Sequence, residues 1–123
     1  MSRNPFCKIL LSILVFTVIS INAFGQNLQW AKQIGGAGWD EGTALITDQN
    51  NNLYVAGLFI GTVDFDPGIG VYNLTSVGEK DAFVCKLDSD GNLLWAKQYG
   101  DSASIDEQSS IGIDAQGNLY ITN

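Results

Sequence analysis

Short apolar segments separated by polar turns follow one another through most of the chain. Four of these segments are Thr43–Thr47, Leu53–Phe59, Ala82–Leu87 and Leu93–Gln98. They are rich in β-branched and aromatic residues, which is typical of strands, and no convincing helical periodicity follows residue 25. In Leu53–Phe59 both alternating faces are apolar, so we expect neighbours on both faces. The pattern therefore predicts an all-β fold.

The turns between these segments share a sequence of their own. Aspartate opens each one and Asn-Leu closes it, at Asp48–Leu53, Asp88–Leu93 and Asp114–Leu119. An aspartate side chain can accept backbone N–H groups in a tight turn, and Gly or Asn suits a position with positive φ. We predict three hairpin connections.

Two parts of the chain repeat each other in order. Trp30-Ala31-Lys32-Gln33 recurs 65 residues later as Trp95-Ala96-Lys97-Gln98, and Asn52–Val55 recurs 66 residues later as Asn118–Ile121. A repeat of this length points to a propeller or another repeat array. We expect the tryptophan of each tetrad to pack against a neighbouring sheet, and its lysine and glutamine to face solvent.

Four strands in a repeated meander, apolar on both faces, describe one blade of a β-propeller. The prediction is a set of four-stranded antiparallel blades that is incomplete: about one full blade plus partial blades. The repeat region is 26–123, with an outer strand at 28–33, a full blade at about 42–98 and a partial blade at about 106–123.

These motifs resemble the bacterial β-propeller repeats called SBBP repeats. The shared features are the Trp30-Ala31 strand, the Gly35-Gly36 turn, the Asp114–Tyr120 hairpin and the Asp81–Lys86 strand. Thr62–Gly68 looks like an elongated variant of the repeat. The resemblance implies an extracellular or cell-surface interaction module, often part of a longer protein with a C-terminal sorting domain.

Residues 1–25 have the composition of a signal peptide. Arg3 and Lys8 precede an apolar run, Ile9–Ile21, and small residues in Ala23-Phe24-Gly25 suit cleavage before Gln26. The run is shorter than the roughly 20 apolar residues of a spanning helix. We expect a secreted or cell-surface bacterial protein with no stable membrane span after cleavage.

The charge and cysteine content of residues 26–123 limit the kinds of partner and reactive group to be expected there. Four lysines against 13 acids leave a net charge of 4 − 13 = −9, which repels phosphate backbones, so we expect no nucleic-acid partner. Cys85 is the single cysteine there, and its place in a strand pattern suggests a buried apolar role.

Asp64 and Asp66 form the candidate metal site. Two carboxylates beside Pro67-Gly68 could offer oxygens to Ca²⁺. In the alternative interpretation both side chains bond the backbone of their own hairpin loop. No other cofactor is expected.

No residue is assigned a catalytic role. The chain has no histidine, and Asp40, Asp81 and Asp106 recur in comparable places before strands, so they suit structure better than a glycosidase acid and base. Trp39 and Tyr72 lie outside the repeated positions, and are the aromatic residues most suited to stack on a sugar.

We therefore expect a non-catalytic propeller module that binds an extracellular protein or glycan. The alternative is part of a hydrolase or lyase that acts on polysaccharide, with catalytic residues outside this chain. One full blade and two partial ones are too few to bury the faces of their own sheets. We expect the missing blades to come from a larger protein or, alternatively, several copies to associate.

Overall fold

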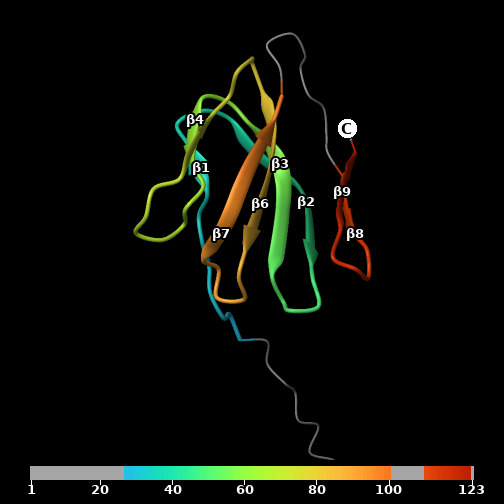
Figure 1. Ribbon diagram of the computed structural model, residues 1–123. Helices are drawn as coiled ribbons and strands as arrows, with labels where there is room; N and C mark the ends of the chain where they lie inside the picture. The colour runs from blue at the N-terminus through green and yellow to red at the C-terminus, as the bar shows by residue number, and fades with distance from the viewer. Residues whose placement is uncertain (1–26, 101–109, 123) are drawn as a thin grey trace, which may run out of the picture.

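The computed structural model describes residues 27–100 and 110–122, which form an all-β structure (Figure 1). The strands are β1 (Gly35–Gly36), β2 (Asp40–Thr47), β3 (Leu53–Phe59), β4 (Thr62–Asp64), β5 (Asn73–Thr75), β6 (Asp81–Leu87), β7 (Leu93–Tyr99), β8 (Ser110–Ile113) and β9 (Leu119–Thr122). In the described part of the chain no helix could cross a membrane. The predicted signal peptide and Asp106 lie outside the described residues.

The largest sheet contains four antiparallel strands in the order β2-β3-β6-β7. Each strand lies beside the next one along the chain, apart from the β4–β5 hairpin inserted between β3 and β6. Tyr54 in β3 lies opposite Lys86 in β6, and Cys85 lies opposite Ala96 in β7. This meander confirms the predicted blade and is the frame for every site described below.

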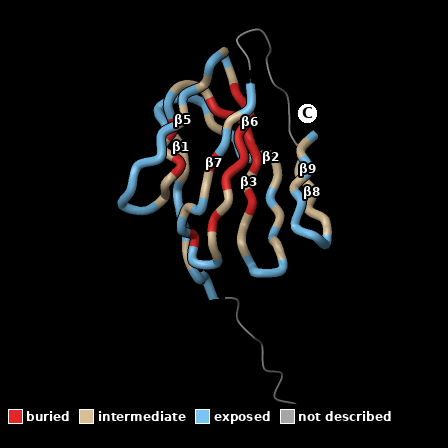
Figure 2. The backbone as a smooth tube through the Cα atoms, in the orientation of Figure 1, coloured by how far each residue is buried: buried red, intermediate tan, exposed pale blue. Residues whose placement is uncertain are grey.

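A second sheet, β1-β4-β5, covers part of one face of the blade. The inserted hairpin supplies Phe65, whose ring centroid lies 5.5 Å from that of Phe59 and 4.8 Å from that of Phe83. Phe59 and Phe65 are fully buried. Figure 2 shows that the buried positions concentrate on β3 and β6, the two central strands. The hairpin therefore completes the hydrophobic core of this blade.

The last two strands, β8 and β9, form a separate hairpin beside β2 (Figure 1). Within residues 110–122 this sheet has two strands, against four in the blade that precedes it. The sheets do not close into a ring, which confirms the incomplete propeller predicted from the repeat.

The first copy of the repeated tetrad differs from the prediction. Residues 28–33 form no strand, because no neighbouring strand takes up their backbone N–H and C=O groups. The segment instead passes the turn between β6 and β7, where the Trp30 indole N–H donates to the carbonyl oxygen of Ser89 at 2.9 Å.

The second copy lies in β7, as predicted, with corrections to two of its side chains. Trp95 packs against Tyr54 of its own sheet, where a neighbouring sheet was expected. Lys97 is exposed, but Gln98 is half-buried. Its amide donates to the carbonyl oxygen of Thr75 and to the carboxylate of Asp81, at 3.0 and 3.2 Å. The glutamine therefore links β7 to the inserted hairpin and does not face solvent.

Candidate functional site

The repeated aspartate turns have the same geometry wherever the structure shows them. Asp48 accepts the backbone N–H groups of Asn50 and Asn52 on Oδ1, both at 2.9 Å, and the Asn52 amide on Oδ2 at 2.8 Å. Asp88 and Asp114 make the equivalent bonds two and four residues ahead. Each carboxylate therefore holds a hairpin turn closed.

The fourth position of each turn needs the left-handed backbone conformation. Gly91 and Gly117 have φ of 79° and 84°, and Asn51 has φ of 60° at the matching position. Asparagine tolerates this region better than other residues with a side chain. The substitution of Asn51 for the usual glycine therefore leaves the turn intact.

These hydrogen bonds stabilise the ionised form of the three turn aspartates. Donation from the Asn52 amide and backbone holds the pKa of Asp48 far below its usual range. Bonds from Asn92 lower the pKa of Asp88, and bonds from Asn118 lower that of Asp114. Carboxylates with depressed pKa values that already accept several hydrogen bonds are rarely protonated at neutral pH, so they make poor general acids.

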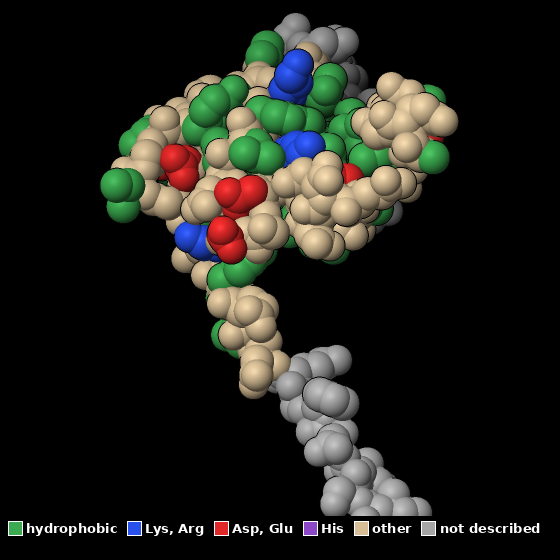
Figure 3. Space-filling model, turned by 60° about the horizontal axis from the view of Figure 1, so that its bottom comes forward, with side chains coloured by type: hydrophobic (Ala, Val, Ile, Leu, Met, Phe, Trp, Pro, Cys, Tyr) green, Lys and Arg blue, Asp and Glu red, His purple; other side chains and the backbone are tan. Residues whose placement is uncertain are grey.

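A polar groove of about 360 Å³ lies between the turn at 48–50 and the turn at 114–117. Because both aspartates bond within their own turns, the side chains free to meet a ligand are amides such as Gln49, Asn50 and Gln116. Figure 3 brings this end of the molecule forward, and its visible surface is largely uncharged side chain and backbone, with a few acidic and basic groups among them. The groove therefore offers amide donors and acceptors to a polar ligand.

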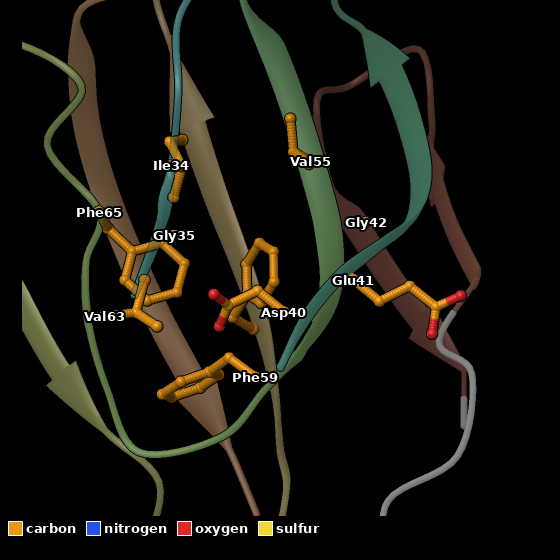
Figure 4. A pocket seen from close by; sticks show the side chains of 10 residues that line it. Ile34, Gly35, Asp40, Glu41, Gly42, Val55, Phe59, Val63 and Phe65 are labelled. Atoms are coloured by element: carbon orange, nitrogen blue, oxygen red, sulfur yellow. The ribbon is translucent and has the colours of Figure 1, made fainter. Parts of the chain in front are cut away.

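A smaller cavity of about 140 Å³ lies between β2 and the inserted hairpin. Phe59, Phe65 and Phe83 are among its lining residues, and the Asp40 carboxylate is directed towards Val63 and Phe65 (Figure 4). Asp40 Oδ2 accepts the Gly36 N–H at 2.8 Å. Its Oδ1 is buried and has no hydrogen-bond partner among the described residues.

The other acids predicted as candidates are committed to the backbone or to side-chain amides. Asp81 is fully buried and accepts the Val77 N–H at 3.0 Å and the Gln98 amide at 3.2 Å. Phe59 lies opposite both Asp40 and Asp81 in the sheet, so it separates these two acids.

Asp64 and Asp66 lie in the loop that joins β4 to β5. Asp64 Oδ1 accepts the N–H groups of Tyr72 and Asp66 at 2.8 and 3.0 Å, bonds that lower its pKa, and Asp66 Oδ1 accepts the Gly68 N–H at 2.8 Å. Among the described residues no group of three or more metal-binding side chains assembles. These bonds match the alternative, structural interpretation, and calcium binding stays a prediction.

The two aromatic residues singled out from the sequence both lie partly exposed. Trp39 is 46% exposed, and the Lys80 ammonium lies 5.1 Å from its ring centroid. Tyr72 donates its hydroxyl proton to the Ala96 carbonyl at 3.1 Å. Neither residue contributes to the groove between the turns.

A contact missed from the sequence joins Asp48, Tyr54, Lys86 and Trp95. The Lys86 ammonium lies 3.3 Å from Asp48 Oδ2 and 4.8 Å from the Tyr54 ring centroid. Trp95 packs edge-on against Tyr54, with centroids 6.0 Å apart. The recurrence of Asp48, Tyr54 and Trp95 in the repeat was the available signal, whereas the strand that carries Lys86 occurs once in the chain. We call these four residues the blade clasp.

Cys85 lies at the centre of β6 and is fully buried. Burial raises the pKa of its thiol to about 11, so the thiolate is scarce at neutral pH. The residue therefore belongs to the core and not to a nucleophilic site.

Comparisons with known proteins support the repeat assignment. Residues 29–58 match the family model described as "SBBP: Beta-propeller repeat". The chain is also 33% identical over 107 residues to an uncharacterised WD repeat-containing protein of Acanthamoeba polyphaga mimivirus, in a match that covers 76% of this chain but 8% of the relative. No solved structure gives a significant match. The chain thus carries a β-propeller repeat of the SBBP type.

Proposed function

We propose that the chain is a non-catalytic, secreted or cell-surface propeller module that binds an extracellular protein or glycan. The observation that carries the proposal is the use of the repeated acids: each described turn aspartate accepts N–H groups of its own hairpin, and Asp48 also pairs with Lys86. The groove between the equivalent turns of two successive repeats is lined in part by the amides of Gln49, Asn50 and Gln116. Amide side chains can both donate to and accept from the hydroxyl groups of a sugar.

Export is the first part of this proposal to test. The full chain should be expressed in a bacterial host and its N-terminus sequenced after recovery from the periplasm or medium. We expect the mature chain to begin at Gln26. Retention of the full chain in the membrane fraction, with an intact N-terminus, would contradict the proposal.

Ligand binding can be tested with soluble xylan and laminarin as glycan probes. We expect a Gln49→Ala/Gln116→Ala variant to retard less than the unchanged chain in affinity electrophoresis, because both amides line the groove. Gln29→Ala is the matched control, since Gln29 is exposed and does not line the groove. Equal retardation of all three proteins would remove the groove from the proposal.

One observation favours a hydrolase or lyase of a different kind from the predicted alternative, which placed the catalytic residues outside this chain. Asp40 has a buried oxygen without a partner in the described structure, beside a cavity. The chain should then release reducing ends from one of these polysaccharides, and Asp40→Asn should abolish that release. No release from either the unchanged chain or the variant is the result expected of a binding module.

A further inference from the structure

The cavity between β2 and the inserted hairpin contains an acid whose hydrogen bonding is incomplete. Asp40 begins β2 and lines this cavity, which has a volume of about 140 Å³. Its Oδ2 accepts the Gly36 N–H at 2.8 Å, whereas its buried Oδ1 has no hydrogen-bond partner among the described residues. A buried carboxylate oxygen without a donor is costly, because water no longer solvates it. The cavity therefore holds an acceptor for which the described residues supply no donor.

The rest of the cavity wall is largely apolar. The rings of Phe59 and Phe65 lie beside Val63, which is 1% exposed, and the Asp40 carboxylate is directed towards this group (Figure 4). Glu41 also lines the cavity, but its carboxylate is directed away from these side chains (Figure 4). None of the described residues that line the cavity has a side chain that donates a hydrogen bond. A donor for Asp40 Oδ1 must therefore come with a bound molecule.

The volume limits the size of that molecule. An apolar cavity of about 150 Å³ can hold one benzene ring, whereas pockets for larger ligands have about 300 to 1,000 Å³. A sugar has the wrong chemistry for this cavity, because apolar walls would remove water from its hydroxyl groups without replacing the lost hydrogen bonds. The cavity also shares no lining residue with the polar groove between the turns. It is therefore a separate site for a small molecule with one hydrocarbon ring.

The charge of Asp40 selects among small molecules that have a donor. An ammonium group donates to a carboxylate and also carries the opposite charge, so each group compensates the other on burial. A neutral alcohol supplies the hydrogen bond but leaves the charge of the acid unpaired. Aromatic ring faces attract cations as well. The net charge of residues 26–123, 4 − 13 = −9, raises the concentration of cations near the protein.

We propose that this cavity binds a small organic ammonium ion with a single hydrocarbon ring. The ammonium group donates to Asp40 Oδ1, and the ring packs against Phe59, Phe65 and Val63. All lining residues lie between residues 34 and 83, so β8 and β9 do not contribute to the site. The inference goes beyond the binding of a protein or glycan proposed above and does not depend on it.

The test is an NMR titration of the ¹⁵N-labelled full chain with benzylammonium and with benzyl alcohol, which has the same ring and nearly the same size. Salt at about 0.15 M weakens pairing with acids on the surface. The Gly36 amide is the reporter, because it donates to the other oxygen of Asp40. We expect saturable shifts of this amide, with benzylammonium bound at least about tenfold more tightly than benzyl alcohol.

Two variants locate the charge that is responsible. Asp40→Asn should weaken the binding of benzylammonium by about tenfold and remove its advantage over benzyl alcohol. Glu41→Gln is the matched control, because it removes one negative charge at the next residue, whose carboxylate is directed away from the apolar wall. It should keep both the affinity and the preference. If Asp40→Asn does not fold, the comparison of the two probes on the unchanged chain still decides.

A larger ammonium ion separates binding in the cavity from general attraction to an acidic protein. The 1-naphthylmethylammonium ion has the same charge but a second ring, so it should bind about tenfold more weakly than benzylammonium. Equal affinity for the two ammonium ions, equal affinity for benzylammonium and benzyl alcohol, or no shift at Gly36 would overturn the proposal. Such a failure would leave the proposed secreted binding function standing, because export and glycan retardation are measured separately.

Discussion

At the scale of single residues, aspartate serves as a cap for backbone N–H groups throughout the described structure. Asp48, Asp88 and Asp114 close hairpin turns, and Asp64 and Asp81 order the connections on either side of β5. A carboxylate that accepts several N–H groups is favoured in its charged form. The acidic composition of the chain thus has a local structural purpose in addition to its effect on net charge.

The lowered pKa values predict how stability depends on pH. A group whose pKa is depressed in the folded state contributes stability above its unfolded value, here 3.8 for Asp48, Asp88 and Asp114. That contribution is lost as pH falls below 3.8 through the folded values, because the proton must displace hydrogen bonds. The thermal midpoint should therefore drop steeply between about pH 4 and pH 2.

The matched variant for this prediction is Asp48→Asn/Asp88→Asn/Asp114→Asn. It keeps the side-chain shape and an acceptor oxygen but cannot titrate, so it should be less stable at neutral pH and vary less below pH 4. Calorimetric scans across this range measure both. An equally steep acid dependence in the variant would place the titrating groups elsewhere.

Gly57 shows how closely β2 and β6 approach the middle of β3. A Cβ at this position would overlap the Glu41 carbonyl oxygen and lie 2.7 Å from the Phe83 ring. We expect Gly57→Ala to lower the free energy of unfolding by about 1 to 3 kcal/mol, measured from urea denaturation curves. Gly42→Ala is the control, because a Cβ there meets nothing within 4 Å. If Gly42→Ala lowered the free energy of unfolding as much as Gly57→Ala does, this account would be contradicted.

At the scale of elements, the strands and hairpins of the blade could be predicted because they depend on local sequence. Alternation and turn residues locate β3, and the Asp-to-Asn spacing locates the hairpin that precedes it. The failure at residues 28–33 has the opposite cause: a strand exists only where a neighbour pairs with it, and no local pattern reports the neighbour. The exposed position expected for Gln98 was wrong for the same reason, since Asp81 reaches it from another strand.

The site was less predictable than the fold. The hydrogen bonding of Asp64 follows from its place in a hairpin loop, and the sequence allowed that interpretation beside calcium binding. The blade clasp around Tyr54 could be predicted only from the register of three strands, and the sequence alone does not determine that register. The buried oxygen of Asp40 that lacks a hydrogen-bond partner could not be predicted either, because the inserted hairpin is what covers it.

The inserted hairpin gives a prediction at this scale. Phe65 is fully buried against Phe59 and Phe83, so Phe65→Ala should lower the free energy of unfolding by about 3 to 5 kcal/mol in urea denaturation. Ile69→Ala, in the same loop, removes a fully exposed side chain and should change it by less than about 0.5 kcal/mol. If both substitutions had equally small effects, the hairpin would not be part of the core.

At the scale of the whole molecule, one complete blade lies beside the first two strands of another. The chain covers 8% of the length of the viral WD repeat-containing relative that it matches. The partners of this chain therefore stay a proposal.

Amide hydrogen exchange of the full chain, followed by NMR, tests the central claim that one closed blade is followed by an open one. We predict slow exchange in β3 and β6, which are hydrogen-bonded on both sides, and fast exchange in β8 and β9. Equal protection of all these strands, or none in β3 and β6, would contradict the account.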